Sequence, residues 1–194
     1  TAGKGNLQQS IINKIKTYFS GKAIDFEIYL TKCRGDAEKI ANKFAKTGEK
    51  ICVYACGGEG TVYEILNGII GFDNVSLGVI PCGSANDFLK YFTSKESFFD
   101  ISSQIAGETV CMDVIKAGDR YCLNGCSVGM DAMVARDMSI FKNFPLVSGK
   151  AAYKLAIVKT FFSKIGVKIK LCIDGKLPQI KHCLFAVIAN APYY

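Results

Sequence analysis

The chain has 194 residues, of which 49% are apolar and 21% charged, and its formal net charge is +7. This length accommodates one large domain or two small ones, with enough apolar residues for a buried core. The excess positive charge suits phosphate ligands or an anionic membrane surface. Nucleic acid is a disfavoured partner, because the lysines are scattered and form no run of five or more.

The nine cysteines include no Cys-x-x-Cys pair, and the single histidine, His182, has no partner at metal-ligand spacing. A disulfide scaffold or a zinc site is therefore disfavoured, and we predict reduced, buried thiols in a cytoplasmic protein. The sequence shows no signal peptide and no apolar run of about 20 residues, the length that spans a bilayer. The glycine-rich start at 1–5 and the strand-like pattern at 183–189 lead us to expect truncation at both ends.

Up to about residue 108, helical and strand-like apolar patterns alternate. We predict helices at 6–19, 35–46, 61–70, 84–92 and 97–105, and strands at 24–30, 51–56 and 76–81. Such alternation implies βαβ units and a parallel sheet covered by helices. We therefore expect an α/β domain over residues 1–108.

Beyond this point the pattern indicates antiparallel β structure. Segments 110–115 and 121–127 flank a turn-like stretch, and segments 167–173 and 183–189 flank Asp174-Gly175-Lys176. Each pair predicts a β-hairpin. We therefore expect a second, β-rich domain over 109–194, incomplete in this chain.

Between these hairpins, residues 148–165 have helical spacing. One face of the helix carries an apolar stripe, consisting of Ala151, Leu155, Val158, Phe162 and Ile165, and it is flanked by Lys150, Lys154 and Lys164. The favoured interpretation is a helix packed on the sheet with solvated lysines. The alternative is a basic, apolar helix near a membrane surface.

Two glycine-containing turns follow predicted strands. Gly57-Gly58-Glu59-Gly60-Thr61 stands between the strand 51–56 and a helix, and segment 81–88 follows the strand 76–81 in the same way. Glycines let a ligand approach the backbone, and the N–H groups of a helix start favour an anion. Adjacent turns at the carboxyl edge of a parallel sheet bracket the usual ligand crevice. A nucleotide phosphate is the expected occupant.

Helix capping is a purely structural alternative for part of these turns. Thr61 with Glu64 fits a capping box, and Ser84 with Asp87 fits a weaker variant of it. Capping does not explain Gly57-Gly58 or Asn86.

These residues resemble a known family. Gly57-Gly58-Glu59-Gly60-Thr61, with Glu64 and Asn67-Gly68, is similar to the GGDGT-x-x-E-x-x-N-G motif of the diacylglycerol kinase catalytic-domain family, which includes bacterial lipid kinases and sphingosine kinases. Segment 81–88 resembles its P-x-G-T-x-N-D-F motif, and 124–132 resembles its N-x-x-x-x-G-x-D-A segment. Residues 1–5 resemble the end of its N-P-x-x-G-x-G opening. The resemblance covers nearly all of this chain and about two-thirds of a typical member.

The resemblance implies a nucleotide-binding α/β domain similar to that of NAD kinases, a β-rich second domain and a cleft between them. It implies ATP-dependent phosphorylation of a diacylglycerol-like lipid hydroxyl with Mg²⁺, whose ligands stay open. The positions that would bind the nucleotide are Gly3, Lys4, Thr31, Gly57, Gly58, Glu59, Gly60, Thr61, Ser84 and Asn86. Those that would face the substrate are Asp87, Asp113, Asn124 and Asp131.

The general base is the open part of this hypothesis. In bacterial members of the family the proposed base is an aspartate of a late Asp-Gly-Glu segment, which this chain does not contain. The alternative is Glu59, which stands where the family motif has aspartate and reaches one methylene further. We therefore keep two other hypotheses: an NAD kinase-type enzyme, which shares the GGDGT turn, and an inactive nucleotide- or lipid-binding relative.

The implied partner is a lipid at an anionic membrane surface, so we expect a cytoplasmic protein that can lie peripherally at the inner membrane face. The oligomeric state stays open, with a homodimer as one option.

Overall fold

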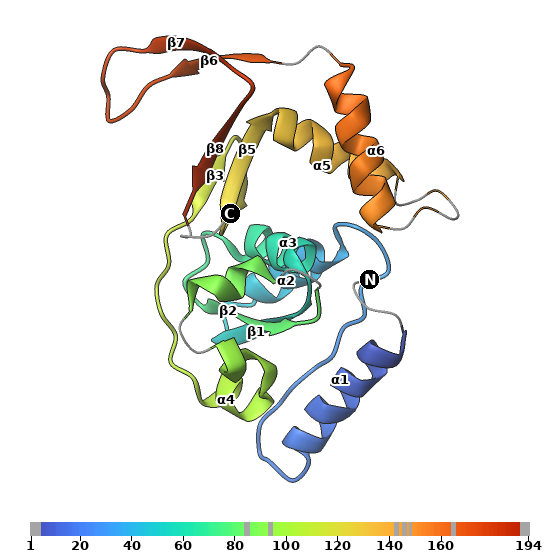
Figure 1. The fold of residues 1–194 in the computed structure, drawn as a ribbon. Coiled ribbons are helices and arrows are strands. Elements are labelled where there is room, and N and C mark those ends of the chain that lie inside the picture. Colours follow the sequence, from blue (N-terminus) through green and yellow to red (C-terminus); the bar gives the residue numbers. More distant parts are fainter. Residues whose placement is uncertain are drawn as a thin grey trace. The chain divides into compact units, whose positions relative to one another are not determined.

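The computed structural model describes residues 5–83, 86–92, 95–141, 144, 147, 149–163 and 166–190 (Figure 1). It is a mixed α/β structure with one parallel strand pair and antiparallel β-hairpins. By its internal contacts the chain divides into two compact units, Thr1–Asn124 with Ala189–Tyr194, and Gly125–Ile188. The domain boundary that we expect after residue 108 stays a prediction.

The parallel pair consists of β1 (Ile51–Gly57) and β2 (Val75–Pro81). Ile51 lies opposite Val75, and Gly57 lies opposite Pro81 at the other end of the pair. Helix α3 (Glu59–Ile69) forms the connection between the two strands. The predicted βαβ unit is therefore confirmed, and both strands end at the two glycine-containing turns.

A small apolar core lies between this strand pair and two helices. Helix α2 (Asp36–Ala45) presents Ala37 and Ala41, and these pack with residues of α3 and the sheet, namely Ala55, Val62, Ile65, Ile69 and Val79. Small side chains let α2 approach α3 closely. At Gly68 a Cβ atom would lie 2.5 Å from the carbonyl oxygen of Glu38.

The predicted strand 24–30 is wrong. The segment is extended but pairs with no strand among the described residues, and Ile24, Phe26, Tyr29 and Leu30 are 41–55% exposed. Its aromatic side chains contact helices instead: the ring of Phe26 stacks on Phe19 at a centroid distance of 4.5 Å. Strand formation requires a hydrogen-bonded neighbour, which the apolar pattern of one segment cannot supply.

Helix α1 (Gly5–Phe19) confirms the prediction at 6–19, and α2 confirms the one at 35–46. The predicted helix 84–92 is a 3-10 helix over Asp87–Tyr91. The helix predicted at 97–105 is divided into a 3-10 helix, Lys95–Phe99, and α4 (Ile101–Ala106). Asp100 causes the break, because its carboxylate accepts a hydrogen bond from the amide of Ser103 at 2.9 Å and so caps α4.

The first predicted hairpin is confirmed with shorter strands. Strand β3 (Ile115–Ala117) pairs antiparallel with β4 (Arg120–Cys122) around Gly118, whose φ of 61° is left-handed. Much of what the sequence predicts as the turn is therefore strand. The hairpin belongs to the same compact unit as the parallel strand pair.

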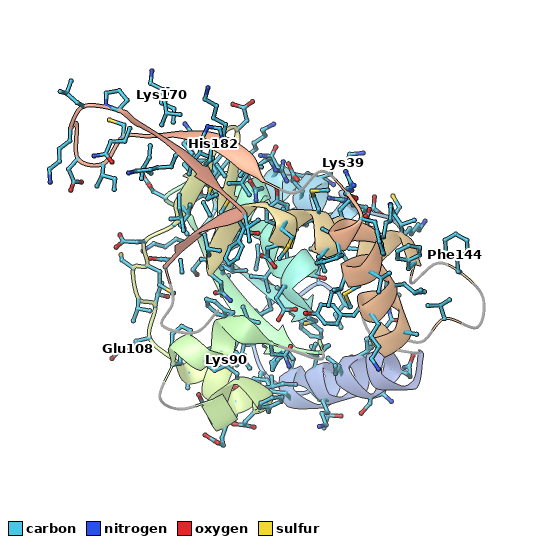
Figure 2. All side chains as sticks on the ribbon, turned by 45° about the horizontal axis from the view of Figure 1, so that its top comes forward. Lys39, Lys90, Glu108, Phe144, Lys170 and His182 are labelled. Carbon is cyan, nitrogen blue, oxygen red and sulfur yellow. The ribbon has the colours of Figure 1, made fainter. Side chains whose placement is uncertain are left out.

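The second predicted hairpin is wrong in its partner. Strand β6 (Val167–Leu171) pairs antiparallel with β7 (Gln179–Cys183), whereas β8 (Phe185–Ala189) pairs with β5 (Gly125–Gly129). Figure 2 shows Lys170 and His182 on the β6–β7 hairpin. The pattern over 183–189 identified a strand, but the pairing depends on where the chain turns.

Helix α5 (Met130–Phe141) was not predicted, and α6 (Gly149–Phe161) confirms the helix expected between the hairpins. The face of α6 that packs is not the predicted apolar stripe. Ala152, Ala156 and Thr160 are buried, and α6 packs against α5, where the buried carboxylate of Asp137 lies 3.0 Å from the Lys159 ammonium. Leu155, Val158 and Phe162 of the predicted stripe are 45–84% exposed. Small residues pack here because they let two helices approach closely.

The predicted thiols are free, but the expectation that they are buried is wrong. Five are exposed, namely Cys33, Cys52, Cys56, Cys111 and Cys172, and four are half-buried, namely Cys82, Cys122, Cys126 and Cys183. Strand-like surroundings in the sequence therefore do not bury a thiol when its side of the strand faces solvent.

Candidate functional site

The first turn is built around two glycines that join β1 to α3. A Cβ atom on Gly57 would overlap Thr61 Oγ1, so only glycine fits beside this hydroxyl. Gly58 is the N-cap of α3 in extended conformation, and no side chain caps the helix there. The Gly58 carbonyl accepts hydrogen bonds from the amides of Thr61 and Val62, at 2.9 and 3.2 Å. The first turn of such a helix presents N–H groups and a positive dipole end to an anion.

The second turn, after β2, packs directly on the first. The amide of Cys82 donates to the Gly57 carbonyl at 3.0 Å. A Cβ atom on Gly83 would lie 2.9 Å from Gly58 Cα and 3.5 Å from Glu59 Oε2. The two turns therefore lie side by side at the carboxyl edge of the strand pair, as the sequence predicts.

Asn86 organises this second turn. Its side-chain oxygen accepts a hydrogen bond from the Gly83 amide at 3.1 Å, and its backbone is left-handed with φ 50°. Asparagine tolerates this conformation better than most residues. Asn86 is also the N-cap of the following 3-10 helix. Ser84 and the side chain of Asp87, both predicted for the site, lie outside the described residues, as do Gly3 and Lys4.

The capping-box interpretation of Thr61 and Glu64 is wrong. Helix α3 begins at Glu59, so Thr61 lies inside its first turn. The carboxylate of Glu64 reaches instead to the start of α2, where it accepts hydrogen bonds from the amides of Gly35 and Ala37 at 2.9 and 3.3 Å. Glu64 thus satisfies the N-terminal amides of a neighbouring helix, a contact that only the tertiary structure creates.

The loop that carries Thr31 is held at its far end. The carboxylate of Asp36 accepts hydrogen bonds from the amides of Lys32 and Cys33 at 2.7 and 3.0 Å, and these bonds lower its pKa. Thr31 is half-buried immediately before this turn. Because Glu64 binds the Gly35 amide, the loop is tied to α3, the helix that begins at the first glycine turn.

Asn67 and Gly68, at the end of the glycine motif, connect α3 to neighbouring elements. The side chain of Asn67 donates to the carbonyl of Tyr121 at 2.9 Å and accepts from its amide at 2.9 Å, as a neighbouring strand would. Gly68 allows the close approach of α2, and its carbonyl accepts from Asn42 at 3.0 Å. Asn67 and Gly68 therefore fasten α3 to the β3–β4 hairpin and to α2. Both residues belong to the predicted motif, but this connecting role follows only from the tertiary contacts and has no signal in the sequence.

Arg120 adds a second link between the hairpin and the helices. Its guanidinium binds both carboxylate oxygens of Glu38, at 2.8 and 2.5 Å, and donates to the Tyr63 hydroxyl at 3.0 Å. This hydrogen-bonded ion pair lowers the pKa of Glu38. A planar guanidinium suits such bidentate binding of a carboxylate.

The remaining predicted residues lie in two places. Asp113 is exposed and Asn124 is half-buried, and both belong to the unit of the glycine turns. Asn190 connects their backbones: its side-chain amide donates to the Asp113 carbonyl at 2.6 Å, and its backbone amide donates to the Asn124 carbonyl at 2.8 Å. Asp131 lies in the first turn of α5, in the other unit.

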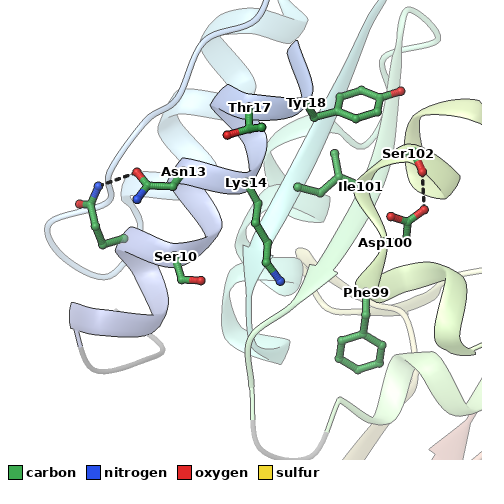
Figure 3. Close-up of a pocket in the computed structure, with 10 residues that line it drawn as sticks. Ser10, Asn13, Lys14, Thr17, Tyr18, Phe99, Asp100, Ile101 and Ser102 are labelled. Carbon is green, nitrogen blue, oxygen red and sulfur yellow. Dashed lines mark hydrogen bonds between the residues drawn. The ribbon is translucent and has the colours of Figure 1, made fainter. Parts of the chain in front are cut away.

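A pocket of about 860 Å³ lies in the unit of the glycine turns but away from them, between α1 and the start of α4 (Figure 3). Its lining includes Lys14, Tyr18 and Asp100 and none of the predicted site residues. Within the described ranges, no group of three or more His, Cys, Asp or Glu side chains could hold a metal ion. The described helices also include none with the length and apolar character needed to cross a membrane.

Known proteins of similar sequence are named as lipid kinases, in agreement with the family resemblance of these turns. Two staphylococcal proteins, each named "Putative lipid kinase", are similar to this chain. The one from Staphylococcus epidermidis (strain ATCC 12228) is 26% identical over 186 residues, covering 93% of this chain and 60% of the relative. The one from Staphylococcus aureus (strain Mu3) is 29% identical over 199 residues, covering 99% and 63%. The chain thus spans less than two-thirds of these relatives.

The crystal structure of a diacylglycerol kinase from Bacillus anthracis matches with a TM-score of 0.63 at 26% identity, over 100% of this chain and 62% of that one. The model of the diacylglycerol kinase catalytic domain matches residues 1–117, which include both glycine turns and more than half of the chain. The chain therefore belongs to the diacylglycerol kinase catalytic domain family.

Proposed function

We propose that the complete protein is an ATP-dependent lipid kinase that transfers the γ-phosphate to a hydroxyl of a diacylglycerol-like lipid. The observation that carries this proposal is the contact between the two glycine turns at the carboxyl ends of β1 and β2, beside the uncapped start of α3. This is the geometry that binds phosphate groups in α/β folds. Family membership gives the turns their proposed substrate.

The residues of the turns fit an ATP phosphate. Gly60 leaves the start of α3 open to a ligand, because beyond the nearby backbone of α3 no atom lies within 4 Å of a Cβ atom built there, whereas Gly57 makes room for the Thr61 side chain. By the family resemblance, Thr61, Ser84 and Asn86 would line the same site with Gly3, Lys4 and Thr31. When bound, Mg²⁺ would neutralise charge on the phosphates.

Glu59 is an acidic residue of the first turn that also lies close to the second. It is the first residue of α3, where the helix dipole favours a carboxylate. Its Oε2 is directed towards Gly83, so the carboxylate lies where the two turns meet. We propose that Glu59 orients the acceptor hydroxyl or the metal, with Asp87, Asp113, Asn124 and Asp131 on the substrate side.

The lipid substrate would be met at a membrane. The net charge of +7 supports an anionic membrane surface as the place of encounter. The cytoplasmic location, the peripheral position at the inner membrane face and the oligomeric state stay predictions.

The test uses the full-length protein with labelled ATP and Mg²⁺, and offers diacylglycerol in anionic vesicles or NAD as acceptor. Label in the lipid phase supports the proposal, and label in NADP would assign an NAD kinase-type enzyme. ATP binding without transfer to either acceptor would assign an inactive relative. Glu59→Asp restores the residue of the family motif and should retain transfer, whereas Glu59→Ala should lose it. Equal transfer by wild type and Glu59→Ala would exclude a role for this carboxylate.

A further inference from the structure

We propose that Asn190 is a positioning residue that holds Asp113 and Asn124 at a fixed spacing for the lipid substrate. The inference rests on the proposed function, because it is the family resemblance that assigns Asp113 and Asn124 to the substrate side. Asn190 itself belongs to no motif that the sequence analysis identified. Its three hydrogen bonds are what single it out.

All three N–H groups of Asn190 are used. The side-chain amide donates to the carbonyl of Asp113 at 2.6 Å and to that of Leu123 at 3.1 Å. The backbone amide donates to the carbonyl of Asn124 at 2.8 Å. One residue thus joins the segment before the β3–β4 hairpin to the segment after it, across 66 to 77 positions of the sequence.

The two joined segments differ in how well the rest of the fold holds them. Leu123 packs against the apolar core, and Tyr121 is bound by Asn67 of α3. Asp113, in contrast, lies in the stretch 108–114, which has no helix or strand, and its side chain is exposed. Asp113 lies in no strand, so no sheet hydrogen bonds hold it. The hydrogen bond from Asn190 therefore ties the Asp113 backbone to the segment 123–124, which the core holds in place.

The chemistry of the side chain suits this task. A primary amide has two donors, and here they face two carbonyl oxygens. A carboxylate at this position would place acceptors against acceptors, and alanine would remove both bonds. Glutamine keeps the two donors at the end of a side chain longer by one methylene. Alanine, aspartate and glutamine therefore distinguish loss of the donors, reversal of polarity and a change in side-chain length.

Asn74 provides a matched control in the same unit. Its side-chain amide also donates to two carbonyl oxygens, those of Ala45 and Glu49, at 3.0 and 2.8 Å. It is half-buried like Asn190 and contacts no predicted site residue through these bonds. Asn74→Ala therefore removes the same kind of bridge without touching Asp113 or Asn124.

The experiment compares Asn190→Ala, Asn190→Gln and Asn74→Ala in the full-length protein, with diacylglycerol in mixed micelles and ATP as substrates. We expect Asn190→Ala to lower kcat/KM for the lipid by roughly tenfold to a hundredfold, since an error of about 1 Å in placing a reacting group can cost a hundredfold. The KM for ATP should stay within about twofold of wild type. Asn190→Gln should recover part of the loss, and Asn74→Ala should show none.

Hydrogen–deuterium exchange of the amides at 111–124 supplies a measurement that needs no activity. Exchange there should rise in Asn190→Ala and not in Asn74→Ala. If wild type transfers no phosphate to lipid, the proposed function fails, while a rise in exchange still shows that Asn190 holds these segments. Should Asn190→Ala not fold, Asn190→Gln decides by the same two measurements. Unchanged exchange, or equal loss of lipid kcat/KM in Asn74→Ala, would overturn the inference.

Discussion

Replacing Gly83 with alanine tests whether the contact between the two glycine turns serves nucleotide binding. The added Cβ atom would lie 2.9 Å from Gly58 Cα and 2.9 Å from Asn86 Oδ1. Carbon atoms in ordinary contact are about 3.5–4.0 Å apart, so the turns must separate by roughly 0.5–1 Å. Overpacking of this kind costs about 1–3 kcal/mol of unfolding free energy. The same displacement should lower kcat/KM for ATP by at least about tenfold.

Alanine substitutions at two other glycines distinguish an effect on packing from an effect on ligand binding. Gly60 has open space around its missing Cβ atom, so Gly60→Ala should leave the unfolding free energy unchanged or raise it by up to about 1 kcal/mol through helix propensity. Its methyl group would nevertheless face the space proposed for the phosphates and weaken ATP binding. Gly107→Ala is the control outside the turns, where a Cβ atom meets the Ser103 carbonyl oxygen at 3.2 Å.

The assays are denaturant unfolding, initial-rate kinetics with varied ATP, and calorimetric titration of the full-length protein with a non-hydrolysable ATP analogue. We expect Gly83→Ala to lose stability and affinity, Gly60→Ala to lose affinity alone, and Gly107→Ala to keep its affinity. If Gly83→Ala and Gly60→Ala both bind the analogue as wild type does, the turns pack together without holding a nucleotide, and the proposed nucleotide site is excluded.

Three further predictions concern the scaffold of the turns. Asn67→Ala removes the bonds between α3 and the β3–β4 hairpin and should lower the unfolding free energy by about 1–3 kcal/mol, measured by urea denaturation, since it leaves the amide and carbonyl of Tyr121 without these partners. An unchanged urea midpoint would contradict this. Glu64→Ala should cost about 1 kcal/mol, because the amides at the start of α2 lose their acceptor; Glu49→Ala, at an exposed position, is the control. Arg120 lowers the pKa of Glu38, so the folded protein holds this proton less tightly than the unfolded chain. The stabilisation is therefore present above the unfolded pKa of about 4.3 and is lost as pH falls through the folded value. Glu38→Gln should flatten this part of the acid-unfolding curve. If wild type and Glu38→Gln have the same pH dependence of the unfolding free energy, the ion pair does not contribute to it.

Local features of the sequence predicted the βαβ unit well. The strands β1 and β2 and the helix between them are apolar patterns with glycines at their ends, and each follows from short-range preferences. The adjacency of the two turns also followed, because parallel neighbouring strands end at the same edge. Short-range patterns alone therefore place the motif residues at 57–61 and 81–88 beside one another.

Pairing and packing choices could not be predicted in this way. The segment 24–30 has a strand-like pattern and no partner among the described residues, and 185–189 pairs with β5 instead of with β6. On α6 the small side chains of Ala152 and Ala156 are buried, and larger apolar ones are exposed. A pattern shows which side chains are apolar, whereas the neighbouring element decides which of them it covers.

Local preferences are sufficient to place two glycine turns after β1 and β2, because glycine, β-branched residues and helical spacing act over a few positions. Tertiary contacts alone give Glu64, Asn67 and Asn190 their roles. Each of these side chains binds backbone groups that lie 27 to 77 positions away, at Gly35 and Ala37, at Tyr121, and at Asp113 and Leu123. A hydrogen bond depends on a distance of about 3 Å in space, and no local pattern encodes that distance.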